Sequence, residues 1–285
     1  MKKYAKLAAA AAASLMVGAA QADQIIDLFN GSQSRITQDD STDPILWATQ
    51  YGPDATVKGL YRDIAVKKTN DFGDPDQAGT SASVFSGTFN WNVDAAVEAL
   101  AVVRWDGSLA GSGTVDAQGG ISNHFLSSSL ATSGISPVLS MGLGDSFIFD
   151  VVQSDLDFTF WFELYDTSGN YSKFKLESQA HLASVSTPIP LQGFVNQCAG
   201  GPSEFADPTD ADNNDVLAGI CSSSSFDIAN IGAIQIILES VPGAGSSVDL
   251  RVSALKVVPE PGSLALVGLG LLGAAAGAGM RRRSA

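Results

Sequence analysis

The sequence predicts an all-β protein whose body, residues 23–257, folds as an antiparallel β-sandwich. Two observations favour this class. Short apolar or alternating runs recur between clusters of Gly, Asn, Asp and Ser, as expected for strands joined by turns. The body shows no long amphipathic helical pattern, and its length of about 235 residues suits one all-β domain.

The first 22 residues have the three-part pattern of a secretory signal peptide. Three lysines precede an apolar run from Leu7 to Gly18, and Ala20-Gln21-Ala22 provides small residues where signal peptidase cuts. We therefore expect an exported chain that begins at Asp23. The alternative is an N-terminal helix in the core.

Nine segments of the body carry the strand pattern. They are Gln24–Phe29, Gly59–Lys67, Ala82–Asn92, Ala96–Trp105, Ser146–Gln153, Asp157–Tyr165, Tyr171–Ser178, Ala233–Ser240 and Ser247–Val257.

One hairpin is predicted in register. Asp166–Asn170 is a turn signal, because Gly and Asn accept left-handed backbone conformations. A symmetric five-residue loop predicts these facing pairs: Tyr165 with Tyr171, Glu163 with Lys173, Trp161 with Lys175, Phe162 with Phe174 and Phe160 with Leu176. Pairs of these kinds each stabilise a sheet by about 0.2–1 kcal/mol.

The polar face of this hairpin is a candidate glycan site. It carries Trp161, Glu163, Tyr165 and Tyr171. Rings can pack on the apolar face of a pyranose while carboxylates accept hydrogen bonds from its hydroxyl groups, so this combination suits sugar binding. The alternative is that Trp161 and Tyr165 pack as core residues under a loop or a second sheet.

Cys198 and Cys221 are the only cysteines. Because an exported chain meets an oxidising compartment, we predict a disulfide between them. It would close a loop of about 24 residues and stabilise the fold by roughly 3 kcal/mol through chain entropy. The alternative is two separate buried thiols.

The segment between the cysteines is rich in acids. Asp210, Asp212 and Asn214 follow the spacing of the first ligands in a calcium loop. Asp215 stands where an EF-hand needs glycine and Cys221 where it needs glutamate, so an EF-hand is excluded. An irregular calcium site and a solvated acidic loop remain as alternatives.

The last 28 residues, 258–285, show several features in a fixed order. The sequence Pro259-Glu260-Pro261 precedes an apolar stretch, Ser263–Met280, and three arginines follow at 281–283. A helix over that stretch would span about 27 Å, close to the thickness of a bilayer core. The arginines are expected to stay cytoplasmic, which places the body outside the membrane.

This tail resembles the PEP-CTERM sorting signal of Gram-negative bacteria. The resemblance implies that an exosortase, a membrane-embedded transpeptidase-like enzyme, recognises and cuts the tail. It also implies an association with exopolysaccharide and biofilm formation, and a final location at the envelope surface or in the extracellular matrix.

The body resembles jelly-roll carbohydrate-binding modules at its two ends. The residues concerned are Ile26-Asp27-Leu28-Phe29 and Val248-Asp249-Leu250. The resemblance implies a jelly-roll-like antiparallel β-sandwich. Such modules often hold a structural calcium near their terminal strands, and Asp27 and Asp249 are the corresponding positions.

Composition limits the function further. With 30 acidic and 16 basic residues, the formal charge is −14, which argues against nucleic acid as a partner. Three of the basic residues lie in 1–22 and three in 281–283, so the body is more acidic still. This charge favours a neutral glycan or a divalent ion over an anionic polymer. The body has no G-x-S-x-G, H-E-x-x-H or phosphate-loop motif.

We therefore predict a non-enzymatic exported protein of the cell surface or matrix, associated with exopolysaccharide and sorted by an exosortase. The second hypothesis is a carbohydrate-binding module that uses the Trp161–Tyr165 face. The third is a polysaccharide-active hydrolase or lyase, for which the sequence locates no pair of catalytic carboxylates. No cofactor is predicted apart from a structural calcium.

Overall fold

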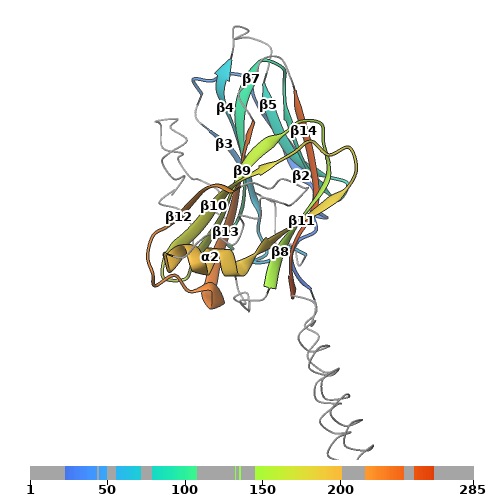
Figure 1. Ribbon diagram of the computed structural model, residues 1–285. Helices are drawn as coiled ribbons and strands as arrows, with labels where there is room; N and C mark the ends of the chain where they lie inside the picture. Colours follow the sequence, from blue (N-terminus) through green and yellow to red (C-terminus); the bar gives the residue numbers. More distant parts are fainter. Residues whose placement is uncertain are drawn as a thin grey trace, which may run out of the picture. The chain divides into compact units, whose positions relative to one another are not determined.

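Two antiparallel sheets packed face to face account for nearly all of the described structure (Figure 1). The computed structural model describes residues 23–43, 45–49, 56–71, 79–107, 132, 135, 145–200, 216–240 and 247–259. The signal peptide predicted at 1–22 and the helix predicted at 263–280 lie outside these ranges. Within them, no helix combines the length and apolar character needed to cross a bilayer.

Sheet A has the strand order β11-β8-β14-β6-β5-β2, and β1 also pairs with β14. Its strands are β1 (Gln24–Asp27), β2 (Gln33–Gln38), β5 (Thr80–Phe85), β6 (Thr88–Val93), β8 (Asp145–Ser154), β11 (Val185–Pro190) and β14 (Val248–Pro259). Gln24 lies opposite Val257, so the first and last strands of the body are neighbours.

Sheet B has the strand order β12-β10-β9-β13-β7-β4-β3. Its strands are β3 (Leu46–Thr49), β4 (Asp63–Asp71), β7 (Val97–Trp105), β9 (Phe158–Asp166), β10 (Tyr171–Ser178), β12 (Val216–Cys221) and β13 (Ile231–Ser240). The short helix α2 (Leu191–Cys198) packs against β10 and β12, and the single-turn η2 (Ile228–Asn230) precedes β13.

The core lies between the sheets and follows the period of two that strands impose. On β6, for example, Phe89, Trp91 and Val93 are buried, whereas the alternate positions point to the outer face. Helix α2 inserts Phe194 between the sheets, with its ring centroid 5.0 Å from Phe174 and 5.8 Å from Phe162. This contact explains why so short a helix is stable here, since its apolar residues join the common core.

The predicted two-sheet sandwich is confirmed, and so is the register of the predicted hairpin. In β9 and β10, Tyr165 faces Tyr171, Glu163 faces Lys173 and Phe162 faces Phe174. The segment predicted as one strand over 82–92 is instead two strands, β5 and β6. Ser86 and Gly87 separate them in a two-residue turn with φ of 55° and 77°. Left-handed backbone at both positions is the conformation of a type I′ turn, one of the two favoured turns of two-residue hairpins.

Strands β2, β3, β11 and β12 and helix α2 were not among the predicted elements. Strand β11 contains Pro188 and Pro190, residues that normally argue against a strand. It lies at the edge of sheet A, where half of its backbone donors need no partner within the sheet. The edge position of β11 in sheet A, and not the strand propensity of its residues, therefore explains why this segment forms a strand.

Candidate functional site

The aromatic face predicted on the hairpin is buried. Trp161 is 8% exposed, and Glu163 and Tyr165 are each 1% exposed, while Tyr171 is partly buried. Trp161 packs with Ala65, among other apolar residues on the outer face of sheet B. The structure thus corrects the predicted open sugar platform, and the alternative of packed side chains is the one observed.

These side chains form a polar cluster that ties three strands together. The Glu163 carboxylate on β9 accepts hydrogen bonds from Tyr165 Oη at 2.6 Å and from Gln235 Nε2 on β13 at 2.9 Å. It also pairs with Lys173 Nζ on β10 at 3.3 Å. The Lys173 ammonium lies 5.0 Å from the centroid of the Trp161 ring. Burial raises the pKa of Tyr165 well above its ordinary value and lowers the pKa of Lys173.

Asp27 is a partner of a buried cation. Its carboxylate accepts hydrogen bonds from Arg62 Nη1 at 2.6 Å, Trp105 Nε1 at 2.8 Å and the backbone N–H of Phe29 at 2.6 Å. Burial raises the pKa of Asp27, although Arg62 and the other donors oppose this shift. A carboxylate surrounded by N–H donors and paired with a guanidinium is already satisfied without a metal ion.

The implied calcium pair of Asp27 and Asp249 is not brought together. Asp27 lies opposite Leu255 on β14, and Asp249 lies six residues earlier on that strand, about 20 Å away. Among the residues that the structure describes, no group of three or more His, Cys, Asp or Glu side chains is placed to hold a metal ion. The other predicted ligands, Asp210, Asp212 and Asn214, lie outside the described ranges.

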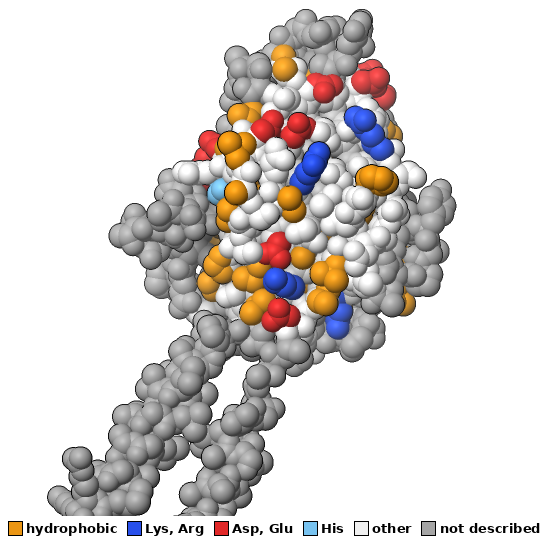
Figure 2. All heavy atoms as spheres, turned by 90° about the vertical axis from the view of Figure 1, so that its right-hand side faces the viewer, with side chains coloured by type: hydrophobic (Ala, Val, Ile, Leu, Met, Phe, Trp, Pro, Cys, Tyr) orange, Lys and Arg blue, Asp and Glu red, His pale blue; other side chains and the backbone are white. Residues whose placement is uncertain are grey.

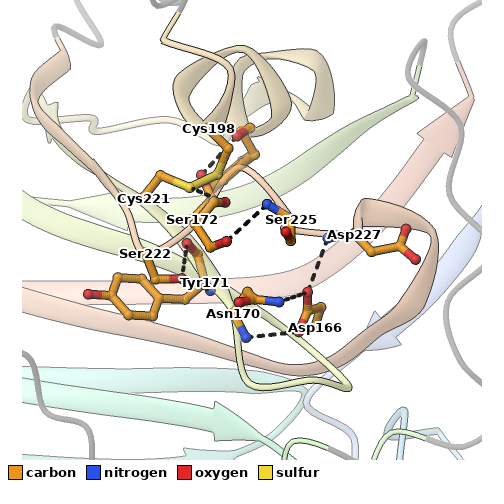
Figure 3. The surroundings of a disulfide bond; sticks show 11 residues. Asp166, Asn170, Tyr171, Ser172, Cys198, Cys221, Ser222, Ser225 and Asp227 are labelled. Carbon is orange, nitrogen blue, oxygen red and sulfur yellow. Dashed lines mark hydrogen bonds between the residues drawn. A yellow bond between two sulfur atoms is a disulfide. The ribbon is translucent and has the colours of Figure 1, made fainter.

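The disulfide between Cys198 and Cys221 is present in the structure (Figure 3). It joins the end of α2 to the end of β12, with the two Cα atoms 5.2 Å apart. Nearby, the Asp166 carboxylate holds the β9–β10 turn by accepting hydrogen bonds from Ser168 N at 2.8 Å and Asn170 N at 2.9 Å. The carboxylate also accepts a hydrogen bond from the backbone N–H of Asp227, just before η2, at 3.1 Å. This end of sheet B is therefore fixed by covalent and polar links.

An open groove of about 550 Å³ crosses the outer face of sheet A. It is lined by Ser32, Gln33, Ser34, Arg35, Ser83, Val84, Phe85, Asn90, Asn92, Asp249, Leu250 and Arg251. The side of the molecule shown in Figure 2 carries mostly uncharged polar side chains and backbone, with separate charged and hydrophobic side chains between them. Nine of the twelve residues that line the groove have polar or charged side chains, in contrast to the aromatic platform expected from the hairpin.

The register of three strands places the groove residues in a row. Ser83 on β5 faces Asn90 on β6, which in turn faces Arg251 on β14. One step along the strands, Asn92 faces Asp249, and its Nδ2 donates a hydrogen bond to the Asp249 carboxylate. Side chains at alternate positions of paired strands share one face, so these polar groups all point out of the sheet.

Phe85 stands at the edge of this row and is 70% exposed. It is the last residue of β5 and faces Thr88 across the Ser86-Gly87 turn. A large exposed aromatic side chain beside hydrogen-bonding groups is a feature of binding surfaces. The position of Phe85 could have been predicted from the sequence, because the Ser86-Gly87 pair that follows it is a turn signal and places the ring at the end of a hairpin.

The buried Arg62 positions the start of β2, which lies beside β5 and forms one side of the groove. Its Nη2 donates to the carbonyl of Gly31 at 2.7 Å, and its Nε donates to Gln33 Oε1 at 3.0 Å. Phe29, just before this segment, has a left-handed φ of 53°, a conformation that costs a non-glycine residue about 1–3 kcal/mol. The contacts of Asp27 and Arg62 with this turn compensate for that cost and fix the entry to β2.

Residues 257–283 match the PEP-CTERM protein-sorting motif. The match confirms the sorting signal predicted from Pro259, Glu260 and Pro261, the apolar stretch and the arginines that follow it. The motif implies export and exosortase sorting to the cell surface. No curated protein matches the chain.

The body resembles several solved β-sandwich structures at low similarity. The crystal structure of the agarase AgWH50C is 13% identical over 69% of this chain, with a TM-score of 0.38. This chain spans about a quarter of that agarase, 25% of its length. The family 11 carbohydrate-binding module of the cellulase Lic26A-Cel5E of Clostridium thermocellum is 10% identical, with a TM-score of 0.33. That match covers 85% of this chain and 96% of the module.

Proposed function

We propose that this chain is a non-enzymatic, exosortase-sorted protein of the cell surface or extracellular matrix whose body binds polysaccharide in the groove on sheet A. One observation carries the proposal. The groove joins an exposed ring, Phe85, to a row of amide and hydroxyl side chains. It lies on a domain whose following residues carry a sorting motif.

The chemistry of the lining suits sugar hydroxyl groups. Asn90 and Asn92 can each donate and accept hydrogen bonds, and Ser83 adds a hydroxyl group. The Phe85 ring offers an apolar surface against which a pyranose can pack. A sugar presents the same combination of hydroxyl groups and apolar C–H faces, so the two surfaces are complementary.

The shape of the groove suits a polymer. From β2 to β14 it crosses three inter-strand spacings, about 14 Å, along the outer face of the sheet. Pockets for small ligands enclose most of the ligand, whereas an open groove leaves one side of it in solvent. A polysaccharide needs that arrangement because its chain continues beyond the site.

The lining also supports a binding role over a hydrolytic one. Glycoside hydrolysis needs two carboxyl groups on either side of the scissile bond. Asp249 is the single carboxylate among the described residues that line the groove, and its Oδ1 accepts a hydrogen bond from Asn92. We therefore expect the secreted chain to release no reducing ends from the polysaccharide that it binds.

Replacing Phe85 with alanine tests the groove. We expect affinity for the host's own exopolysaccharide to fall about tenfold, because the variant loses the stacking surface. The melting temperature should barely change, since the side chain is 70% exposed. Affinity electrophoresis and thermal melts of the secreted chain measure both quantities.

Trp161→Ala is the control for that experiment. Trp161 is buried, so its truncation should cost about 3–5 kcal/mol of stability. The folded fraction should still bind with unchanged affinity. Both variants are measured at a temperature where they are folded. Loss of binding in Trp161→Ala but not in Phe85→Ala would show that the glycan site lies on the β9–β10 hairpin and not in the groove.

Processing of the tail is tested separately. Mature protein isolated from the host should begin at Asp23 and lack residues 263–285, since the sorting motif implies cleavage by an exosortase. Intact-mass spectrometry gives both ends in one measurement. A mature chain that retains its C-terminal arginines would contradict exosortase processing.

A further inference from the structure

We propose that the groove selects anionic glycans, in which carboxylate or sulfate groups are held by Arg35 and Arg251. This inference rests on the proposed function, because it names the class of polysaccharide that the same groove would bind. It differs from what the total charge predicts, since an acidic body favours a neutral partner.

Most basic side chains of the body are already engaged. The ion pairs and hydrogen bonds are Arg62 with Asp27, Lys173 with Glu163, Lys175 with Glu239, Lys256 with Asp150, Arg104 with Gln235, Lys67 with the carbonyls of Ser41 and Asp43, and Lys68 with the carbonyl of Asp39. Arg35 and Arg251 differ, because both are exposed and neither forms an ion pair with another residue in the described part of the chain. Both line the groove.

The two arginines stand at opposite sides of the same row. Arg251 on β14 faces Asn90, which faces Ser83 on β5, and Arg35 lies on β2, the next strand across. Their backbones are thus separated by three inter-strand spacings, about 14 Å. A polymer lying along this row would meet a guanidinium on each side of the polar stretch.

The local charge of the groove has the opposite sign to that of the whole chain. Two guanidinium groups face one carboxylate, Asp249, and the Asn92 amide is hydrogen-bonded to that carboxylate. Long-range repulsion from an acidic body disfavours polyanions elsewhere on the surface. A guanidinium also binds carboxylate or sulfate oxygens through two parallel N–H donors, which gives orientation as well as affinity. The groove is therefore suited to an anionic strand that the rest of the surface repels.

Two pairs of matched polymers test this inference on the full chain as its host secretes it. Polygalacturonate is compared with its carboxyl-reduced form, and dextran sulfate with dextran. We expect at least one anionic polymer to bind at least tenfold more tightly than its neutral counterpart, and that preference to weaken as salt is raised. The pair that shows the preference identifies whether carboxylate or sulfate is the group recognised.

Charge variants assign the preference to the groove. Arg35→Gln and Arg251→Gln should each weaken binding to the anionic polymer about tenfold, the usual loss for a charge-assisted hydrogen bond. Asp249→Asn, which removes the groove's carboxylate, should strengthen it. Lys58→Gln removes the same positive charge from a residue that does not line the groove, so it should leave binding unchanged. Thermal melts confirm that each variant is folded.

The outcomes separate this inference from the function on which it rests. Equal binding to charged and neutral polymers, lost in Phe85→Ala, would keep the polysaccharide groove and overturn anion selection. Equal weakening by Arg251→Gln and Lys58→Gln would also overturn it, because the effect would then be non-specific. If the chain bound neither the four polymers nor the host's exopolysaccharide, both proposals would be overturned.

Discussion

Replacing Arg62 with methionine is expected to destabilise the fold by about 3–5 kcal/mol, the usual cost of leaving one partner of a buried ion pair charged and alone. Both side chains of the Asp27–Arg62 pair are fully buried, with 2.6 Å between Nη1 and Oδ2. The same substitution removes the hydrogen bonds from Arg62 to Gly31 and Gln33. Denaturant unfolding followed by tryptophan fluorescence measures the loss.

The loss of unfolding free energy in Arg62→Met, relative to the unsubstituted protein, should become smaller as the pH falls. Burial already raises the pKa of Asp27, and removing the positive charge of Arg62 raises it further. Between the ordinary carboxyl pKa and this raised value, the folded state holds a proton that the unfolded state releases. Stability then increases as the pH decreases. Unfolding curves at pH 7 and pH 5 show the difference, and a deficit that is equal at both would contradict this account.

Lys256→Met is the control for Arg62→Met. Lys256 pairs with Asp150 at 3.1 Å, but both side chains are partly exposed. Exposed pairs typically contribute about 0–1 kcal/mol, so this variant should lose no more than that. Similar losses of stability in the two variants would show that removing one partner of the buried pair costs no more than removing one partner of a partly exposed pair.

Glu163→Gln is expected to destabilise the fold by a similar amount, about 3–5 kcal/mol. The substitution keeps the size of the side chain but removes the negative charge beside the buried Lys173 ammonium. It also places an amide where the carboxylate accepts hydrogen bonds from Tyr165 and Gln235. The matched control is Glu177→Gln on the neighbouring strand β10, where the side chain is partly exposed, and we expect a change within about 0.5 kcal/mol.

The pH dependence of this second variant should have the opposite sign. Burial lowers the pKa of Lys173, whereas the charge of Glu163 raises it, so the pKa falls further when Glu163 becomes neutral. As the pH rises through that lowered value, folded Lys173 loses its proton while the unfolded chain keeps it. The fold therefore gains stability and the deficit shrinks between pH 7 and pH 9. A deficit that grows over this range would contradict the assignment to Lys173.

The parts of the fold that were predictable depend on neighbouring residues in the sequence. The β9–β10 hairpin was predicted in register because Asp166–Asn170 is a turn and the pairs on both sides are complementary. The disulfide was predicted from the two cysteines together with the signal peptide, which indicates export to an oxidising compartment. The sorting motif was predicted from the order of its features in one short segment.

The site was not predictable in the same way, because its residues come from separate strands. Alternation correctly placed Trp161 and Glu163 on the outer face of their strand, but it could not show that this face is covered. Burial there depends on residues of other strands, such as Ile237 on β13. The groove likewise depends on β5, β6 and β14 being neighbours, although β14 is far from the other two in the sequence. The sheet order decides which outward residues share a surface.

The place of β14 in sheet A has a consequence for how the protein matures. This strand is the last of the body, yet it lies between β8 and β6 and also pairs with β1. Until residues 248–257 join it, sheet A is in three parts that no strand connects: β11 with β8, β6 with β5 and β2, and β1. The sorting motif begins at 257, directly behind them. The strand that completes sheet A is therefore the last of the body, and the sorting motif follows it directly, so the sheet can be complete only once the whole body up to the start of the motif is present.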